Sequence, residues 1–324
     1  MKERDRMLAA LNGQPCDRLP AIEWVNWWDK TIARWMEDGL PAGLNKQQLF
    51  ERFGLDMYHH FDLPLTDGQL THSIANEEHY EKSLPHLYCD SGLTFVKDYM
   101  TSVKEAHEKG DIFIYFSMEG FFWHPRTLFG IEAHLYAFYD YPDLMHEMNR
   151  RLAEYHLKCL EVLYDCVKPE FMTFTEDMSY NHGPMLSKEL FDEFLAPYYR
   201  KVIPEIKRQG TKVLIDTDGD VEPLIPWFEE VGIEGVLPLE RQAGVDVNRI
   251  RENHPDFILI GGYDKTIMYK GEEAMRVEFE RILPAMRAGR YIPCVDHQTP
   301  PDVSLENFYV YVRLLKEYTA LAAQ

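Results

Sequence analysis

Two patterns alternate along most of the 324-residue chain. Short runs rich in β-branched and aromatic residues, which are typical of strands, are each followed by a longer segment with helical periodicity. Strands that alternate with helices form a parallel sheet through right-handed crossovers, and eight of them favour a closed barrel. The sequence therefore predicts an α/β fold, a single (β/α)8 TIM barrel domain over residues 1–324. The eight expected strands are 19–24, 56–60, 111–116, 170–175, 212–216, 234–240, 256–262 and 290–295.

One region interrupts this alternation between strands two and three. Residues 69–74 and 92–99 alternate polar and apolar side chains, with turn residues between the two runs. Such a pattern predicts a hairpin or loop excursion within residues 63–103, which would act as an insertion or lid. The other segments with helical patterns are 3–12, 30–38, 45–53, 142–166, 187–208, 221–231, 246–253, 271–288 and 304–322.

The composition excludes several classes of partner. With 34 Lys+Arg against 54 Asp+Glu, the net charge of -20 repels phosphate backbones and makes nucleic acid a poor partner. The N-terminal MKERDRMLAAL is charged and amphipathic, and no apolar run approaches membrane-spanning length. We therefore expect a soluble, cytoplasmic protein with no membrane partner. The 5 cysteines are scattered without a C-x-x-C pair, which favours reduced thiols.

Polar side chains follow successive strands of the predicted barrel. The segment KVLIDTDGD runs from a strand into Asp216 and Asp218, and YIPCVDHQTP runs from the last strand into His297. The carboxyl ends of barrel strands meet at one rim, so these groups should share a cleft. The full set of rim residues is Glu176, Asp177, Asp216, Asp218, Glu240, Tyr263, Asp264, Lys265, Asp296 and His297.

Such a ring of charges must be hydrated, paired or bound to a cation. Oxygen and nitrogen ligands suit a divalent metal such as zinc, manganese or iron. The alternative for the TDGD sequence is an Asp-Gly turn in which Asp220 caps a helix, although this does not account for Asp216 and Asp218. The alternative for His297 is an ordinary hydrogen bond beneath two prolines. We interpret Asp216, Asp218, Glu176 and Tyr263 as catalytic candidates.

Aromatic and basic residues near the strand exits are candidates for substrate binding. Trp24, Trp27 and Trp123 offer faces on which a flat ligand would stack, with core packing as the alternative. Arg126 would bind a ligand carboxylate or pair with the nearby acids, and Lys265 has the same two options.

Several segments of the chain resemble the uroporphyrinogen decarboxylase superfamily. They are RDRMLAALNGQPCDRLP, FTEDMSYNHGPMLSKELFDEFLAPYYRKVIPEIK, DTDGDVEPLIPWFEEVGIEGVLPLE, GGYDK and PPDVSLEN, and together they cover most of the chain. The resemblance implies a (β/α)8 barrel. It also implies one of two activities, that of a true uroporphyrinogen decarboxylase or that of a zinc-dependent corrinoid methyltransferase, which moves a methyl group from a methylated cobamide to a thiol such as coenzyme M.

Departures from the two family patterns separate these activities. True decarboxylases resemble one another in an arginine-rich block after the first strand, where this chain reads WVNWWDKTIARW without such a cluster. The methyltransferases carry H-x-C after strand five and a late cysteine. Those positions hold Asp216, Asp218 and His297 here. The resemblance therefore implies a metal bound by Asp218 and His297, with Asp216, Glu176 or Glu240 completing the shell, and harder ligands than thiolates would make that metal a stronger Lewis acid.

The leading hypothesis is a metal-dependent methyltransferase-like enzyme that moves a methyl group from or to a corrinoid. Its expected partners are a small-molecule substrate and a corrinoid protein, and a homodimer is the expected assembly. One alternative is a metal-free decarboxylase of a tetrapyrrole or small carboxylic acid, with Asp216 or Asp218 as the acid/base and Arg126 or Lys265 holding the substrate. The other alternative is a corrinoid- or tetrapyrrole-binding protein without catalysis.

Overall fold

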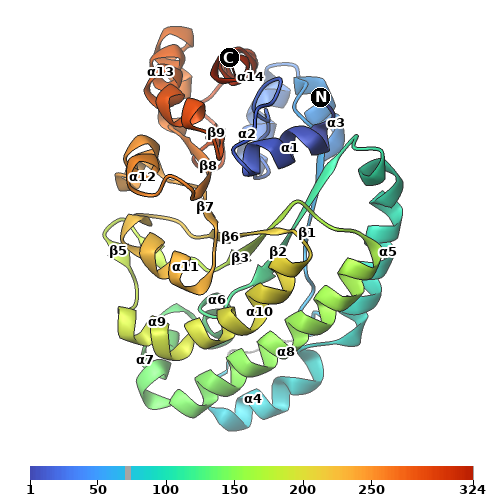
Figure 1. Cartoon of the computed structure of the whole chain (residues 1–324), viewed down its shortest axis with the longest axis vertical. Helices are drawn as coiled ribbons and strands as arrows, with labels where there is room; N and C mark the ends of the chain where they lie inside the picture. The colour runs from blue at the N-terminus through green and yellow to red at the C-terminus, as the bar shows by residue number, and fades with distance from the viewer. Residues whose placement is uncertain (70–73, 324) are drawn as a thin grey trace.

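The computed structural model describes residues 1–69 and 74–323. Its centre is a curled, parallel 7-stranded sheet in the order β1-β2-β3-β6-β7-β8-β9 (Figure 1). This arrangement confirms the predicted α/β barrel-like fold class. The strands are β1 Tyr58–Asp62, β2 Phe113–Glu119, β3 Phe171–Thr175, β6 Lys212–Asp216, β7 Gly235–Leu237, β8 Ile258–Tyr263 and β9 Tyr291–Val295, with a small antiparallel hairpin formed by β4 Ser179–Tyr180 and β5 Gly183–Pro184.

Helices surround the sheet, and α5, α8 and α10 form the outer layer beside β2, β3 and β6 (Figure 1). The longest, α8, begins at Pro142, where the missing amide hydrogen of proline is harmless, and ends at Cys166 as predicted. The helices are α1 Glu3–Leu11, α2 Asp29–Glu37, α3 Lys46–Phe53, α4 Glu77–Ser83, α5 Asp90–Glu108, α6 Trp123–Phe129, α7 Ile131–Asp140, α8 Pro142–Cys166, α9 Lys188–Phe194, α10 Ala196–Arg208, α11 Ile225–Val231, α12 Val247–Asn253, α13 Glu272–Ala288 and α14 Leu305–Ala322. Short 3-10 turns are η1 Leu84–His86, η2 Glu222–Leu224, η3 Arg241–Ala243 and η4 Lys265–Lys270.

The first predicted strand, 19–24, does not form. This segment runs between β1 and β9, but isolated hydrogen bonds hold it there instead of the regular backbone hydrogen bonds of a β-ladder. Ala21 O accepts from Asp56 N at 2.9 Å, and Trp24 Nε1 donates to Val295 O at 3.2 Å. Pro20 lacks a backbone donor, which weakens strand pairing here. The segment occupies the position of an eighth strand without the hydrogen bonds of one.

The excursion between β1 and β2 lies where the sequence predicts it, but it is helical. Residues 92–99 fall within α5, so the second arm of the predicted hairpin is wrong. The buried residues Val96, Met100 and Val103 recur at helical spacing. Burying this apolar face stabilises the helix more than the alternation of polar and apolar residues over 92–99 would stabilise a strand. The first arm, 69–74, falls mostly outside the described residues.

Aromatic side chains fill the bottom of the barrel. The ring of Tyr58 stacks on Phe113 with centroids 5.2 Å apart, and Tyr115 stacks on Phe171 at 4.5 Å. Every second side chain of a strand points to the same face of the sheet, and these four residues lie at the positions that face inward. The aromatic rings fill the lower part of the sheet interior, and the inward polar side chains of Ser117, Thr173 and Asp216 lie toward the carboxyl ends of their strands. Across residues 1–69 and 74–323, no helix combines the length and apolarity needed to span a membrane.

Candidate functional site

A cavity of about 250 Å³ opens at the carboxyl ends of the strands. Its walls come from the inward positions of β1, β2, β3, β6 and β7, above the aromatic layer, and from the segment after residue 23. The lining residues are Trp24, Val25, Asn26, Lys46, His60, Asp62, Tyr115, Ser117, Thr173, Thr175, Asp216 and Leu237. The polar part of this lining consists largely of hydroxyl and carboxyl groups, so the cavity offers hydrogen-bond acceptors beside its apolar surface.

One wall of the cavity is a hydrogen-bonded chain of side chains. His60 Nε2 and Ser117 Oγ lie 2.8 Å apart, and Ser117 Oγ lies 2.8 Å from Thr173 Oγ1. The imidazole of His60 also stacks on Tyr115, and burial lowers the pKa of His60 to about 3. Sequence reasoning missed His60 and Asp62 because it ended the second strand at residue 60, two residues before the observed end of β1.

Asp216 ends β6 and faces this cavity. Within residues 1–69 and 74–323, its carboxyl group makes no hydrogen bond or ion pair that meets normal geometry. Burial raises the pKa of Asp216 well above its usual range, and the nearby charges of Asp218, Asp177 and Asp62 add to the rise. Asp216 therefore keeps its proton to a higher pH than an exposed aspartate would.

Next to the cavity, three predicted rim residues come together. Asp218, Glu240 and His297 each offer one ligand atom, and these atoms all lie within 4.8 Å of one another. Three atoms that each bind a common ion at about 2.1 Å lie no more than about 4.2 Å apart, so only small side-chain rotations are needed. The chemistry and spacing of this donor set, which we call the acid–histidine cluster, fit a divalent metal.

The charges around the cluster are unbalanced. Burial raises the pKa of Asp218 to about 7, and the charges of Glu240 and Asp177 add to this rise while Lys265 opposes it. Burial and Lys265 lower the pKa of His297, which favours the neutral imidazole that binds metals. A bound cation would relieve the repulsion among the carboxylates, so proton release would accompany its binding.

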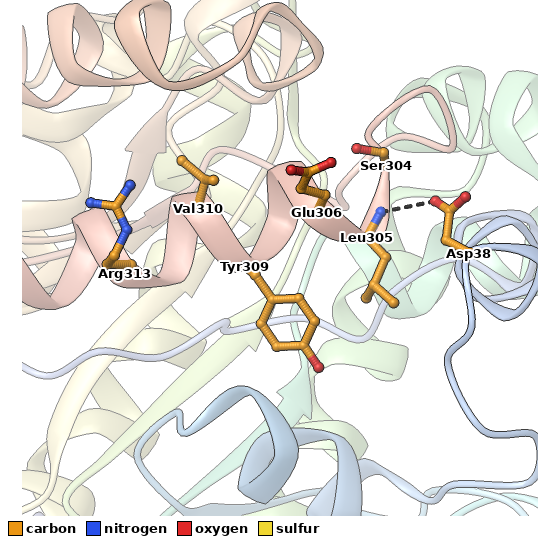
Figure 2. Close-up of a pocket in the computed structure, with 7 residues that line it drawn as sticks. All are labelled: Asp38, Ser304, Leu305, Glu306, Tyr309, Val310 and Arg313. Atoms are coloured by element: carbon orange, nitrogen blue, oxygen red, sulfur yellow. Dashed lines mark hydrogen bonds between the residues drawn. The ribbon is translucent and has the colours of Figure 1, made fainter.

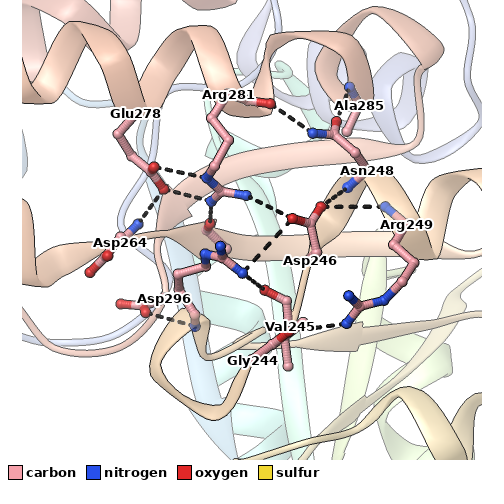
Figure 3. Close-up of polar contacts among 12 residues, drawn as sticks. Gly244, Val245, Asp246, Asn248, Arg249, Asp264, Glu278, Arg281, Ala285 and Asp296 are labelled. Atoms are coloured by element: carbon pink, nitrogen blue, oxygen red, sulfur yellow. Dashed lines mark hydrogen bonds and ion pairs between the residues drawn. The ribbon is translucent and has the colours of Figure 1, made fainter.

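Asp296 fixes the strand exits that carry the cluster (Figure 3). It is fully buried, and its carboxylate accepts from Arg241 N at 3.0 Å and from Lys265 N at 3.2 Å. Burial raises the pKa of Asp296 to about 6, against the opposing charge of Lys265. Because Asp296 joins the exits of β7, β8 and β9, it helps to position Glu240, which precedes its partner Arg241, and His297, which follows Asp296 itself.

A second layer of polar contacts supports these loops from outside (Figure 3). Arg281 pairs with Glu278 at 2.6 Å and lies 3.7 Å from Asp246. Glu278 Oε1 in turn accepts from Asp264 N at 2.9 Å. These contacts connect α13 to the loops that follow β7 and β8.

The glycine of the TDGD sequence has a specific role. Gly219 N donates to Glu240 Oε2 at 3.0 Å, which joins the loop of Asp218 to Glu240. Its φ is +81°, and a Cβ atom there would lie 2.4 Å from the carbonyl carbon of Tyr180. Only glycine fits a left-handed conformation so close to another backbone.

We expect Gly219→Ala to lower the free energy of unfolding by about 2–4 kcal/mol, because both the backbone conformation and the contact become unfavourable. Gly244→Ala is the matched control: its φ is +90°, but among the described residues nothing lies within 4 Å of the added Cβ. That control should lose only about 1 kcal/mol. Urea denaturation measures both values, and equal losses would contradict the proposed clash.

Three predicted site residues lie away from the cleft. Glu176 is fully buried and accepts hydrogen bonds from Tyr199 and three backbone amides, and burial raises its pKa to about 7 while those bonds oppose the rise. Tyr263 is buried, and its hydroxyl donates to Met275 O at 3.3 Å. Trp27 packs in an aromatic cluster with Trp35. The structure places these three side chains in the core.

The other predicted binding residues lie at or near the rim. Trp24 lines the cavity, and its ring stands edge-on to His297 with centroids 6.3 Å apart. Lys265 Nζ lies 3.7 Å from Glu240 and 3.6 Å from Asp296. The guanidinium of Arg126 covers Trp123 at 5.0 Å and donates to a backbone carbonyl, so both side chains are partly occupied by protein contacts.

A larger groove of about 620 Å³ lies on the outer surface near α2 and α14 (Figure 2). Leu305 N donates to Asp38 Oδ2 at 3.1 Å across it. None of its lining residues belongs to the acid–histidine cluster, so we do not place the candidate site there. The groove is lined by Asp38, Ser304, Leu305, Glu306, Tyr309, Val310 and Arg313.

Fold and site together define a barrel-like protein with a small cavity and an acid–histidine cluster at its carboxyl-end rim. The family model described as uroporphyrinogen decarboxylase (URO-D) matches residues 64–318. The chain therefore belongs to the uroporphyrinogen decarboxylase family, as its sequence resemblance predicts.

Curated relatives agree with this membership, and a solved structure shares the fold. Uroporphyrinogen decarboxylase of Pseudomonas fluorescens (strain Pf0-1) is 25% identical over 189 residues, which are 56% of this chain and 50% of the relative. The enzyme of Ruthia magnifica subsp. Calyptogena magnifica is 22% identical over 183 residues, 56% of this chain and 51% of the relative. The chain thus spans about half the length of these relatives. A methyltransferase from Methanosarcina mazei shares the fold, with a TM-score of 0.66 at 15% identity, over 98% of this chain and 99% of that one.

Proposed function

We propose that this protein is a metal-dependent methyltransferase that moves a methyl group between a corrinoid and a small molecule. The observation that carries the proposal is the convergence of Asp218, Glu240 and His297 at the rim. Family membership and the shared fold with a methyltransferase from Methanosarcina mazei support it. The lack of an arginine cluster after residue 24 favours this activity over decarboxylation of a polycarboxylate.

Asp218, Glu240 and His297 would hold zinc, manganese or iron. When bound, such a metal acts as a Lewis acid that lowers the pKa of the methyl acceptor and makes it a nucleophile. His297 is suited to this role because its imidazole is held neutral. Lys265, at 3.7 Å from Glu240, limits the negative charge of the cluster. Trp24 borders both the cavity and His297, so a small molecule in the cavity would lie beside the cluster.

The size of the cavity indicates which of the two reactants, the corrinoid or the small molecule, it would hold. At about 250 Å³ it is smaller than the roughly 300–1,000 Å³ of pockets for drug-sized ligands. A corrinoid is much larger than such ligands, so it would approach from outside the rim, carried by a corrinoid protein. The small molecule would occupy the cavity, where hydroxyl and carboxyl oxygens favour a ligand with hydrogen-bond donors.

A metal-free decarboxylase is the second candidate. The buried carboxyl group of Asp216, with its raised pKa, faces the cavity in the way that a proton donor would. Among the described residues that line the cavity, however, Lys46 is the one cation, against the carboxyl groups of Asp62 and Asp216. This lining suits a small monocarboxylic acid better than a tetrapyrrole with many carboxylates.

The test is methyl transfer from methylcobalamin to small thiols, phenols and amines, before and after treatment with a chelator. We expect chelation to lower the rate at least about 100-fold and added zinc, manganese or iron to restore it, because metal activation contributes several kcal/mol. Absence of methyl transfer, together with decarboxylation that survives chelation, would overturn the proposal in favour of the second candidate.

A further inference from the structure

One cation lines the cavity at the rim without an anion to pair with it. Lys46, the first residue of α3, contributes its side chain to the cavity wall. In the described ranges, 1–69 and 74–323, its ammonium group makes neither a hydrogen bond nor an ion pair of normal geometry. The carboxyl groups of Asp62 and Asp216 line the same cavity but lie beyond ion-pair distance from it.

Two aromatic rings hold the ammonium group in place. Lys46 Nζ lies 4.4 Å from the ring centroid of Tyr58 and 5.7 Å from that of Phe50. The face of a ring attracts a cation but accepts none of its conventional hydrogen bonds. The ring of Tyr58 is itself fixed, because its hydroxyl donates to Glu23 O at 2.7 Å. The N–H groups of Lys46 are therefore left for a molecule in the cavity.

The start of α3 determines where Lys46 lies. Asn45 Oδ1 accepts from Gln48 N at 2.9 Å, and Asn45 N donates to Gln48 Oε1 at 2.9 Å. This capping box stabilises the first turn of the helix. Lys46 and Phe50 are four residues apart, so they lie on the same face of α3. Lys46 is thus a positioned part of the cavity wall.

An anionic ligand would stabilise this ammonium group. Burial lowers the pKa of Lys46 to about 8, although the charge of Asp62 opposes the change. The amine therefore still carries its positive charge near pH 7, with part of its hydration lost. A ligand carboxylate that accepts from Lys46 would replace this hydration, because hydrogen bonds between ionised groups are the strong ones.

The rest of the lining restricts the kind of anion. A cavity of about 250 Å³ admits only a small molecule, and several carboxylates on it would meet the carboxyl groups of Asp62 and Asp216. The hydroxyls of Ser117 and Thr173, 2.8 Å apart, offer acceptors to a ligand that donates. A molecule with one carboxylate and one hydroxyl, thiol or amino group satisfies both kinds of lining.

We propose that the cavity binds a small carboxylic acid through an ion pair with Lys46, and that the hydroxyl, thiol or amino group of this acid accepts the methyl group. The second half of this inference rests on the proposed function, and the first half does not. In the transfer, the acceptor atom forms a bond to the methyl group and its proton passes to water. The bond between the methyl group and its donor breaks, and the electron pair stays on the donor.

The test compares acids with their amides in ligand-observed NMR titrations of the whole chain. The acids are mercaptoacetate, glycolate and glycine, and the amides are mercaptoacetamide, glycolamide and glycinamide. The wild-type protein should bind at least one acid about 10–100-fold more tightly than its amide, because the ion pair is lost in the amide.

Variants of Lys46 make this test specific. Lys46→Met keeps an unbranched side chain against Tyr58 and should abolish the preference for the acid while leaving the affinity for the amide unchanged. Lys46→Arg keeps the charge and should keep most of the preference. Lys109→Met is the matched control, because Lys109 is an exposed lysine at the end of α5 and does not line the cavity. It should bind like the wild type.

The outcomes separate this inference from the proposed function. A wild-type protein that binds none of the three acids more tightly than its amide would refute the role of Lys46, and so would a preference that survives in Lys46→Met. Methyl transfer to neutral acceptors at the same kcat/KM as to the acids would refute the acid as acceptor and leave the proposed function standing. A protein that binds acids through Lys46 but transfers no methyl group to any acceptor would refute the proposed function alone.

Discussion

Glu176→Ala should lower the free energy of unfolding by about 4 kcal/mol or more. The carboxylate accepts from Phe121 N at 2.7 Å, Phe122 N at 2.8 Å and Trp123 N at 2.9 Å, and from the hydroxyl of Tyr199. Each buried donor left without an acceptor costs about 1–3 kcal/mol, and the substitution leaves several such donors in the core. Urea denaturation followed by circular dichroism measures the change.

Two further variants make this prediction specific. Tyr199→Phe removes one donor and leaves the carboxylate its three amides, so we expect a loss of only about 1 kcal/mol. Glu176→Gln keeps one acceptor oxygen but turns an amide group toward backbone donors, so its loss should be intermediate. A loss below about 1 kcal/mol for Glu176→Ala would show that the carboxylate does not hold the start of α6.

Glu23→Gln should stabilise the protein at alkaline pH and change it little at pH 5. Glu23 is 1% exposed, and neither of its oxygens forms a hydrogen bond of good geometry within the described part of the chain, although Tyr311 lies close. Burial raises the pKa of Glu23 from 4.5 to about 8. Between these two values the folded protein binds a proton that the unfolded chain releases, so stability falls as the pH rises through this window.

The size of this effect follows from the shift in pKa. At about 1.4 kcal/mol per pKa unit, Glu23 should account for on the order of 4 kcal/mol of the stability that the wild-type protein loses between pH 5 and pH 9. Glu23→Gln should lack this part of the loss and keep the part due to the other buried carboxyl groups. Urea denaturation at both values of pH measures it. The exposed Glu81→Gln variant is the control and should follow the wild type. A difference between Glu23→Gln and the wild type that is the same at both values of pH would refute the raised pKa.

The sequence predicts the acid–histidine cluster because a simple geometric rule governs it. Asp218, Glu240 and His297 follow three different strands, and parallel strands bring their carboxyl ends to one rim. The rule works where the strand limits are clear, as for 212–216, which is also the observed β6. It misses Asp62 because the predicted end of the second strand lies two residues too early.

Glu176 and Asp177 show where sequence reasoning ends. Both residues follow β3, and the sequence predicts that one of them is functional but favours Glu176. The structure turns Glu176 into the core, where Tyr199 and three backbone amides donate to it, and the next residue, Asp177, adopts a φ of +46°. A left-handed residue at a strand exit breaks the alternation of side-chain directions along the strand, and no periodicity in the sequence records it. Residues 19–24 likewise have a strand-like composition but no ladder to join.

The most direct test of the central claim is the metal content and metal affinity of the purified protein. We expect about one zinc, manganese or iron per chain in the wild type, and an affinity at least about 100-fold lower in Asp218→Ala and in His297→Ala. Asp220→Asn is the matched control, because Asp220 lies on the same loop but outside the cluster. Its metal content should equal that of the wild type. A wild-type protein that neither contains nor takes up any of the three metals would contradict the account.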